Sequence, residues 1–99
     1  AYQLFCAFED KKLVGIISLR SETHISLLFV DPAYHKKGIG RALIDYVGRY
    51  VLLEEGFHKI TVNAAPYAVG FYHKLGFYDT GREMTNDGIR YTPMEKKLV

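Results

Sequence analysis

Two glycines separated by one residue lie at the end of the segment 35–40, between an apolar run and an amphipathic stretch. The apolar run 25–30 is typical of a strand, and the spacing of apolar residues in 39–55 predicts a helix. A glycine-bearing turn that leaves a strand and opens a helix exposes backbone N–H groups at the positive end of the helix dipole. Such a turn suits a phosphate or pyrophosphate. Turns before helices also contain glycine for steric reasons alone, so both interpretations stay open.

A second candidate for chemistry is the phenol of Tyr72, in a stretch that Pro66 opens and Gly76 ends. A phenol can donate a proton to a developing anion. Phe71, Tyr72 and Leu75 also form an apolar stripe at helical spacing. On the residues alone, this stripe favours core packing over catalysis for Tyr72.

Of the four histidines, His24 lies on the strand-like run 24–30, with Ser26 as its neighbour on the same face of the strand. An imidazole titrates in the range that a base needs, although a single strand histidine is often structural. We expect His58 and His73 to be solvated. No group of His, Cys, Asp and Glu has metal-ligand spacing, so we expect no metal.

Composition predicts one globular domain, residues 1–99, with 48% hydrophobic and 24% charged residues. A formal charge of +2 with scattered Lys and Arg argues against a nucleic-acid partner. No apolar run is long enough for a membrane span, so we expect no membrane partner. The single cysteine, Cys6, cannot form an internal disulfide. We expect it to be a buried inert thiol in a strand, and we expect a cytoplasmic, reducing location.

The elements follow an order typical of a mixed fold of helices and strands. We expect a central mixed, mostly antiparallel sheet with flanking helices and a β-α-β crossover from residue 25 to residue 62. Pro93 should interrupt the last strand. Ligands of such sheets bind beyond the carboxyl ends of parallel strands. The expected strands are 2–8, 13–19, 24–30, 60–62, 77–78, 81–85 and an interrupted 89–98, and the expected helices are 39–55 and 66–75.

In this order, two blocks resemble the GNAT superfamily of acyl-CoA-dependent N-acyltransferases. The block 28–43, L-F-V-D-P-A-Y-H-K-K-G-I-G-R-A-L, is similar to the family's strand, V-x-P, (Q/R)-x-x-G-x-(G/A) and helix. The block 62–77, V-N-A-A-P-Y-A-V-G-F-Y-H-K-L-G-F, is similar to its second half-site. The resemblance covers nearly the whole chain. It implies an N-acetyltransferase that moves an acetyl group from acetyl-CoA to an amine acceptor by direct transfer in a ternary complex.

The resemblance also implies roles for individual residues. Tyr72 would protonate or stabilise the departing thiolate, and His24 falls near the position of a glutamate base in some relatives. Phe29 and Val30 would pair with the pantetheine arm through their backbone, although core packing explains their side chains. The segment 36–41, which is the loop and the start of the helix, would wrap the pyrophosphate. The alternative for the side chains of Lys36 and Lys37 is that they are solvated and do not contact the ligand. The implied coenzyme A contacts are Phe29, Val30, His35, Lys36, Lys37, Gly38, Ile39, Gly40, Arg41, Asn63 and Tyr72.

The chain departs from the family pattern at three places. His35 stands where Gln or Arg is usual, and Ala65 stands where Asn is frequent, so that Asn63 would supply the amide. The strand and helices that usually precede the first hairpin, and help to wall the acceptor site, have no counterpart here. The alternative function is therefore a coenzyme-binding module without catalysis, or a fragment with an incomplete acceptor site. An exposed sheet edge also predicts a weak homodimer, and the sequence leaves the small-molecule or peptide amine acceptor open.

Overall fold

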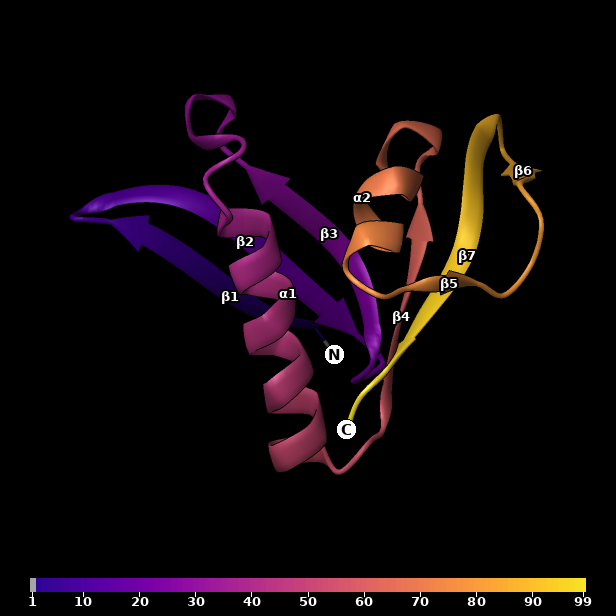
Figure 1. Ribbon diagram of the computed structural model, residues 1–99, viewed down its shortest axis with the longest axis horizontal. Helices are drawn as coiled ribbons and strands as arrows, with labels where there is room; N and C mark the ends of the chain where they lie inside the picture. The colour runs from indigo at the N-terminus through magenta and orange to yellow at the C-terminus, as the bar shows by residue number, and fades with distance from the viewer. Residues whose placement is uncertain (1) are drawn as a thin grey trace.

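A mixed seven-stranded sheet positions the other elements of the chain (Figure 1). The structure is a computed structural model that describes residues 2–99. Its strands are β1 (Tyr2–Glu9), β2 (Lys12–Arg20), β3 (His24–Val30), β4 (Lys59–Ala64), β5 (Tyr78–Asp79), β6 (Met84–Asn86) and β7 (Ile89–Lys97). Its helices are α1 (Ile39–Tyr50) and α2 (Val69–Lys74), with short 3-10 turns η1 (Pro32–Tyr34) and η3 (Pro66–Ala68) and a π-turn η2 (Val51–Glu55).

The strand order is β1-β2-β3-β4-β7-β5, with β6 paired to β7. All pairs are antiparallel except β3 with β4, which the crossover through α1 joins in parallel. This confirms the expected mixed, mostly antiparallel sheet. The parallel register runs only through His24↔Thr61 and Ile25↔Val62. Beyond Ile25 the two strands separate, and a gap opens in the sheet toward Val30.

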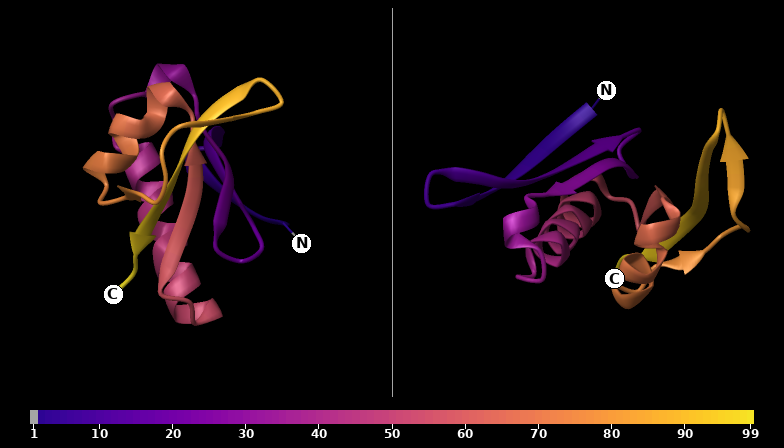
Figure 2. Two further views of the ribbon diagram at one scale, coloured as in Figure 1. Left: turned by 90° about the vertical axis from the view of Figure 1, so that its right-hand side faces the viewer. Right: turned by 90° about the horizontal axis from the view of Figure 1, so that it is seen from above.

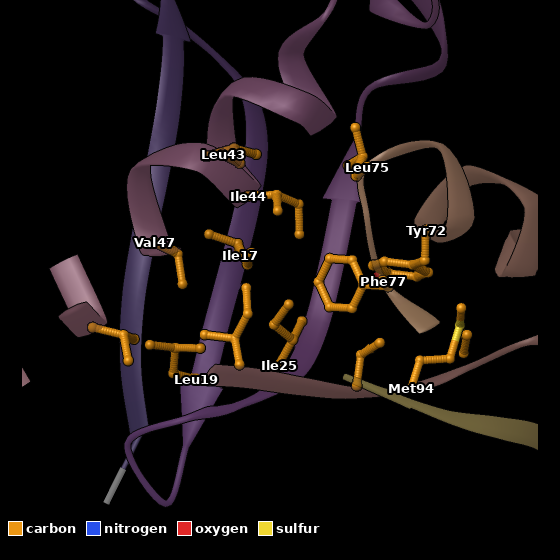
Figure 3. Close-up of a cluster of buried hydrophobic side chains, with 14 residues drawn as sticks. Ile17, Leu19, Ile25, Leu43, Ile44, Val47, Tyr72, Leu75, Phe77 and Met94 are labelled. Carbon is orange, nitrogen blue, oxygen red and sulfur yellow. The ribbon is translucent and has the colours of Figure 1, made fainter. Parts of the chain in front are cut away.

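Both helices lie on one face of the sheet (Figure 2), and the core lies between them and the strands. Figure 3 shows Ile17 and Leu19 of β2 under Val47 of α1, with Tyr72 and Phe77 packed beside Ile25. This is why the apolar residues of α1 recur at helical spacing.

The opposite face of the sheet carries large exposed apolar side chains. Phe5 packs edge-on against Tyr46 and Tyr50 of α1, so the odd positions of β1 face the helices and the even positions face away. Within residues 2–99, no helix covers this second face (Figure 2). Its exposed apolar side chains include Tyr2, Leu4, Phe8, Leu27 and Phe29.

Glycines lie at both boundaries of the first helical segment, and Gly56 ends it as expected. Gly38 is the N-cap of α1 with φ 79°, and Gly56 closes η2 with φ 75°. The predicted helix 39–55 is thus α1 followed by a π-turn. Likewise the predicted helix 66–75 consists of η3 and α2, and Gly76 closes it with φ 93°.

Two local expectations were wrong. Cys6 is exposed, because it occupies an even position of β1 on the face without helices. Pro93 does not interrupt β7, which runs unbroken and pairs Pro93 with Asn63. The Pro93 carbonyl accepts a hydrogen bond from the Thr80 N–H, just after the end of β5. The nitrogen and the carbonyl of a strand residue face the same neighbour, so the N–H that Pro93 lacks would face β5 and not β4. No ladder bond to β4 is lost.

Within residues 2–99, no helix has the length and hydropathy needed to cross a membrane. The same residues contain no cluster of three or more His, Cys, Asp or Glu side chains that could hold a metal ion.

Ile17 is fully buried at 0% exposure beneath α1, so Ile17→Ala should lower the free energy of unfolding by about 2–5 kcal/mol. Leu27→Ala removes a similar side chain that is 50% exposed, and should cost less than about 1 kcal/mol. Urea denaturation of both variants measures the difference. Equal losses would contradict the assignment of the core to the helix-covered face.

Candidate functional site

A cavity of about 650 Å³ opens where β3 and β4 separate. Its walls are the carboxyl end of β3, the start of α1, the end of β4 and the inner face of α2. This is the edge predicted from the parallel crossover. The lining residues are Leu28, Val30, Tyr34, His35, Lys36, Gly38, Ile39, Gly40, Arg41, Asn63, Ala64, Ala65, Tyr67, Ala68, Phe71, Tyr72, Lys74 and Leu75.

One end of the cavity is the N-terminus of α1. The Ala42 N–H makes the first intrahelical bond, to the Gly38 carbonyl at 2.9 Å, so the N–H groups of residues 39–41 precede the helical ladder. No acidic residue lies in this first turn. Free N–H groups, the helix dipole and the Arg41 side chain together form a site for a phosphate-type anion.

The two glycines of this turn have different structural roles. Gly38 has φ 79°, and a Cβ built there would meet no atom within 4 Å, so the backbone conformation itself favours glycine. A Cβ on Gly40 would lie 3.1 Å from Cζ of Phe71, so this glycine lets α1 approach α2. The sequence leaves a phosphate turn and steric reasons both open for these glycines, and for Gly40 the structure shows a packing reason.

The other end of the cavity carries Tyr72 of α2. Its side chain is 5% exposed and packs edge-on between Phe71 and Phe77, each with ring centroids 5.1 Å away. Burial, with a smaller effect from Tyr67, raises the pKa of Tyr72 to about 12. Among the described residues 2–99, no polar side-chain atom is sealed from solvent without a partner. The Tyr72 hydroxyl lines the cavity and is protonated at neutral pH.

The backbone of β3 presents one free edge to the cavity. The Asp31 N–H donates to the Val14 carbonyl of β2, and strand residues point their N–H and C=O groups to alternate edges. Phe29 therefore faces β2, as Asp31 does, and Val30 faces the gap. The side chain of Phe29 is exposed and absent from the cavity lining, whereas Val30 lines it.

The other predicted coenzyme contacts lie mostly around the cavity. His35, Lys36, Arg41 and Asn63 line it together with the segment 38–40. Lys37 does not; its ammonium lies 5.6 Å from the centre of the Tyr34 ring, which Lys12 approaches to 5.4 Å. The structure thus brings nine of the eleven predicted residues to one cavity and leaves out Phe29 and Lys37.

His24 lies apart from this group. It begins β3, at the opposite end of the strand from the glycine turn, and does not line the cavity. Its Nδ1 is 2.9 Å from Oγ1 of Thr61. Burial, and secondarily the charge of Arg20, lowers the pKa of His24. The structure therefore separates the predicted base from the predicted acid.

The remaining histidines lie outside the cavity lining, as expected for solvated groups. His58 is exposed, and His73 pairs with Asp79 through Nε2 and Oδ1 at 2.7 Å. His73 thereby ties the end of α2 to β5.

Sequence reasoning missed Tyr67, which is 93% exposed at the mouth of the cavity. The sequence signal for it was a large aromatic residue that follows Pro66 in a turn, where a side chain is not expected to pack into the core. It also missed Tyr34 and Lys74, which line the mouth.

Comparison with known proteins finds similarity to acetyltransferases. The family model described as "Acetyltransferase (GNAT) domain" matches residues 1–98. The peptidyl-lysine N-acetyltransferase YjaB of Salmonella typhimurium is 36% identical over 74 residues, which are 75% of this chain and 48% of that protein. The glucosamine 6-phosphate N-acetyltransferase of Trypanosoma brucei brucei is 30% identical over 95 residues, with 86% and 64% covered. The chain thus spans about half to two thirds of these relatives.

Solved structures share the fold. A GCN5-related N-acetyltransferase from Rhodopseudomonas palustris superposes with a TM-score of 0.87 at 28% identity, covering 98% of this chain and 62% of that one. An aminoglycoside 6'-N-acetyltransferase complexed with coenzyme A gives a TM-score of 0.84 at 19% identity, covering 99% and 73%.

The raised pKa of Tyr72 predicts a pH-dependent loss of stability. The native phenol ionises near pH 12 and an unfolded one near 10, so between these values the unfolded chain binds fewer protons. Across this window, the free energy of unfolding of the unchanged protein should fall by about 3 kcal/mol more than that of Tyr72→Phe. The reason is that a shift of one pKa unit is worth about 1.4 kcal/mol. Denaturant unfolding of both proteins from pH 9 to pH 12 measures it. Parallel pH profiles would show that the phenol is not buried.

Proposed function

The chain belongs to the GNAT family of acetyltransferases, and we propose that it transfers an acetyl group from acetyl-CoA to an amine. The observation that carries the proposal is one cavity with an anion site at the start of α1 and the Tyr72 hydroxyl at the other end. A donor with a pyrophosphate at one end and a thioester at the other would use both features. Small residues between the two ends, Ala64, Ala65 and Ala68, leave room for its arm.

In this proposal the pyrophosphate of the donor binds the N–H groups of residues 39–41. Arg41 and Lys36 add positive charge at the mouth. The pantetheine arm follows the edge of β3 at Val30, which has no β4 partner there and so suits an added strand-like ligand. The thioester then lies near Tyr72.

The chemical step is aminolysis within a ternary complex. The lone pair of the acceptor nitrogen attacks the thioester carbonyl, the C–N bond forms and the C–S bond breaks. The nitrogen loses a proton to water, and the leaving thiolate takes one from Tyr72, which is later reprotonated from solvent. A phenol with a pKa of about 12 is fully protonated at neutral pH and so can donate. Because His24 does not line the cavity, we assign no step to it.

Tyr72→Phe keeps the ring and its two aromatic contacts but removes the proton. The turnover number should fall by roughly 10- to 10⁴-fold, while KM for acetyl-CoA changes little, since the interaction strengthens as charge develops on sulfur. Release of CoA thiol from acetyl-CoA with a panel of amines measures it.

Tyr78→Phe is the matched control, because that hydroxyl bonds Glu95 on β7 and lies outside the cavity. Full activity of a folded Tyr72→Phe variant would remove Tyr72 from the mechanism. Binding of CoA without turnover by the unchanged protein would favour the alternative function, a coenzyme-binding module.

Gly38→Val should weaken CoA by about 1–3 kcal/mol, the cost of unmaking charge-assisted hydrogen bonds to the turn. Gly88→Val is a close control, because Gly88 has φ 78° against 79° for Gly38 and equally free space around it. Both valines strain a left-handed backbone, but Gly88 lies in the β6–β7 turn, away from the cavity. Calorimetry with CoA compares them. Equal affinities in the two folded variants would refute the anion site.

A further inference from the structure

The His35 side chain bonds a backbone carbonyl of β3 that has no strand partner. Nε2 of His35 lies 3.0 Å from the Val30 carbonyl oxygen. A carbonyl can only accept, so Nε2 carries the proton and donates it. This oxygen belongs to the edge of β3 that faces the gap, because the neighbouring Asp31 N–H faces β2.

The same oxygen lies on the path between the two ends of the cavity. Val30 lines the wall between the turn at Gly38 and the phenol of Tyr72. A ligand that spans these ends and carries amide N–H groups, as pantetheine does, needs acceptors along this wall. The parallel pairing of β3 with β4 stops at Ile25↔Val62, so the Val30 carbonyl has no hydrogen-bond partner on β4.

We propose that His35 occupies the position of a pantetheine amide, and that its ring must leave the Val30 carbonyl before the arm can bind. The inference rests on the proposed binding of CoA. It gives His35 a role opposite to that of a coenzyme contact, since its side chain competes with the arm instead of holding the pyrophosphate.

The loop can keep its shape when the ring moves. Asp31 caps η1 by accepting the Ala33 N–H at Oδ1 (2.9 Å), and its carbonyl accepts the Tyr34 N–H (2.8 Å). The His35 N–H bonds the Pro32 carbonyl at 3.3 Å. None of these bonds uses the imidazole, and His35 is exposed, so its ring has space to rotate.

The test compares CoA with 3′-phospho-ADP, which keeps both phosphates of the pyrophosphate and lacks the arm. The measured quantity is the ratio of the Kd for 3′-phospho-ADP to the Kd for CoA. His35→Ala should raise this ratio by about three- to tenfold, the worth of one released hydrogen bond. His58→Ala, at an exposed histidine at the start of β4 and outside the lining, should leave it unchanged.

Using a ratio removes any general effect of the substitution on the anion site, because both ligands carry the same phosphates. An unchanged or lowered ratio would overturn the proposal. If the unchanged protein binds neither ligand, the proposed function itself fails, which is a distinct result.

A second readout follows the ring directly. In nitrogen-15 spectra of the imidazole side chains, the His35 Nε2 signal should shift when CoA binds and keep its position with 3′-phospho-ADP. The same shift with both ligands would mean that His35 responds to the phosphates, and would overturn the competition with the arm.

Discussion

The structure depends on the point where β3 and β4 stop pairing, after Ile25 and Val62. A parallel pair that continued to Val30 would fill the cavity with its own ladder. The early stop leaves backbone groups of β3 without a strand partner, which normally costs stability when such groups are buried. Two features reduce that cost: the edge lines an open cavity, and His35 takes the Val30 carbonyl. The gap thereby becomes a site for an extended ligand with amide groups.

Two helices keep this gap at a fixed width. Phe71 of α2 rests against Gly40 at the start of α1, and the same Phe71 ring packs edge-on against Tyr72. Phe71 therefore links the anion site and the phenol, although they lie on different helices. A larger residue at position 40 would separate the helices, and would move the two ends of the cavity relative to each other.

Local patterns predicted the parts of the fold that depend on neighbours in sequence. Periodicity and glycine signals located α1, Gly56 and Gly76, because these features act over one or two turns. Cys6 and Pro93 were misplaced since their exposure and pairing depend on which face and which neighbour the sheet supplies, and alternation alone does not say this. Phe29 and Val30 could not be separated either, because a one-residue change in register exchanges the two edges of a strand. His24 lies apart from the cavity because it is the first residue of β3, whereas the glycine turn follows the last one.

Burial of Tyr72 links stability to chemistry. The packing of this ring between Phe71 and Phe77 adds to the core, and the same desolvation raises its pKa. A more exposed phenol would be a stronger acid but would hold its oxygen less firmly in the cavity. A fully buried one would need a hydrogen-bond partner, and that partner would compete with the substrate. With the ring in the core and the hydroxyl at the cavity wall, the side chain is fixed in place while its proton remains available to a ligand.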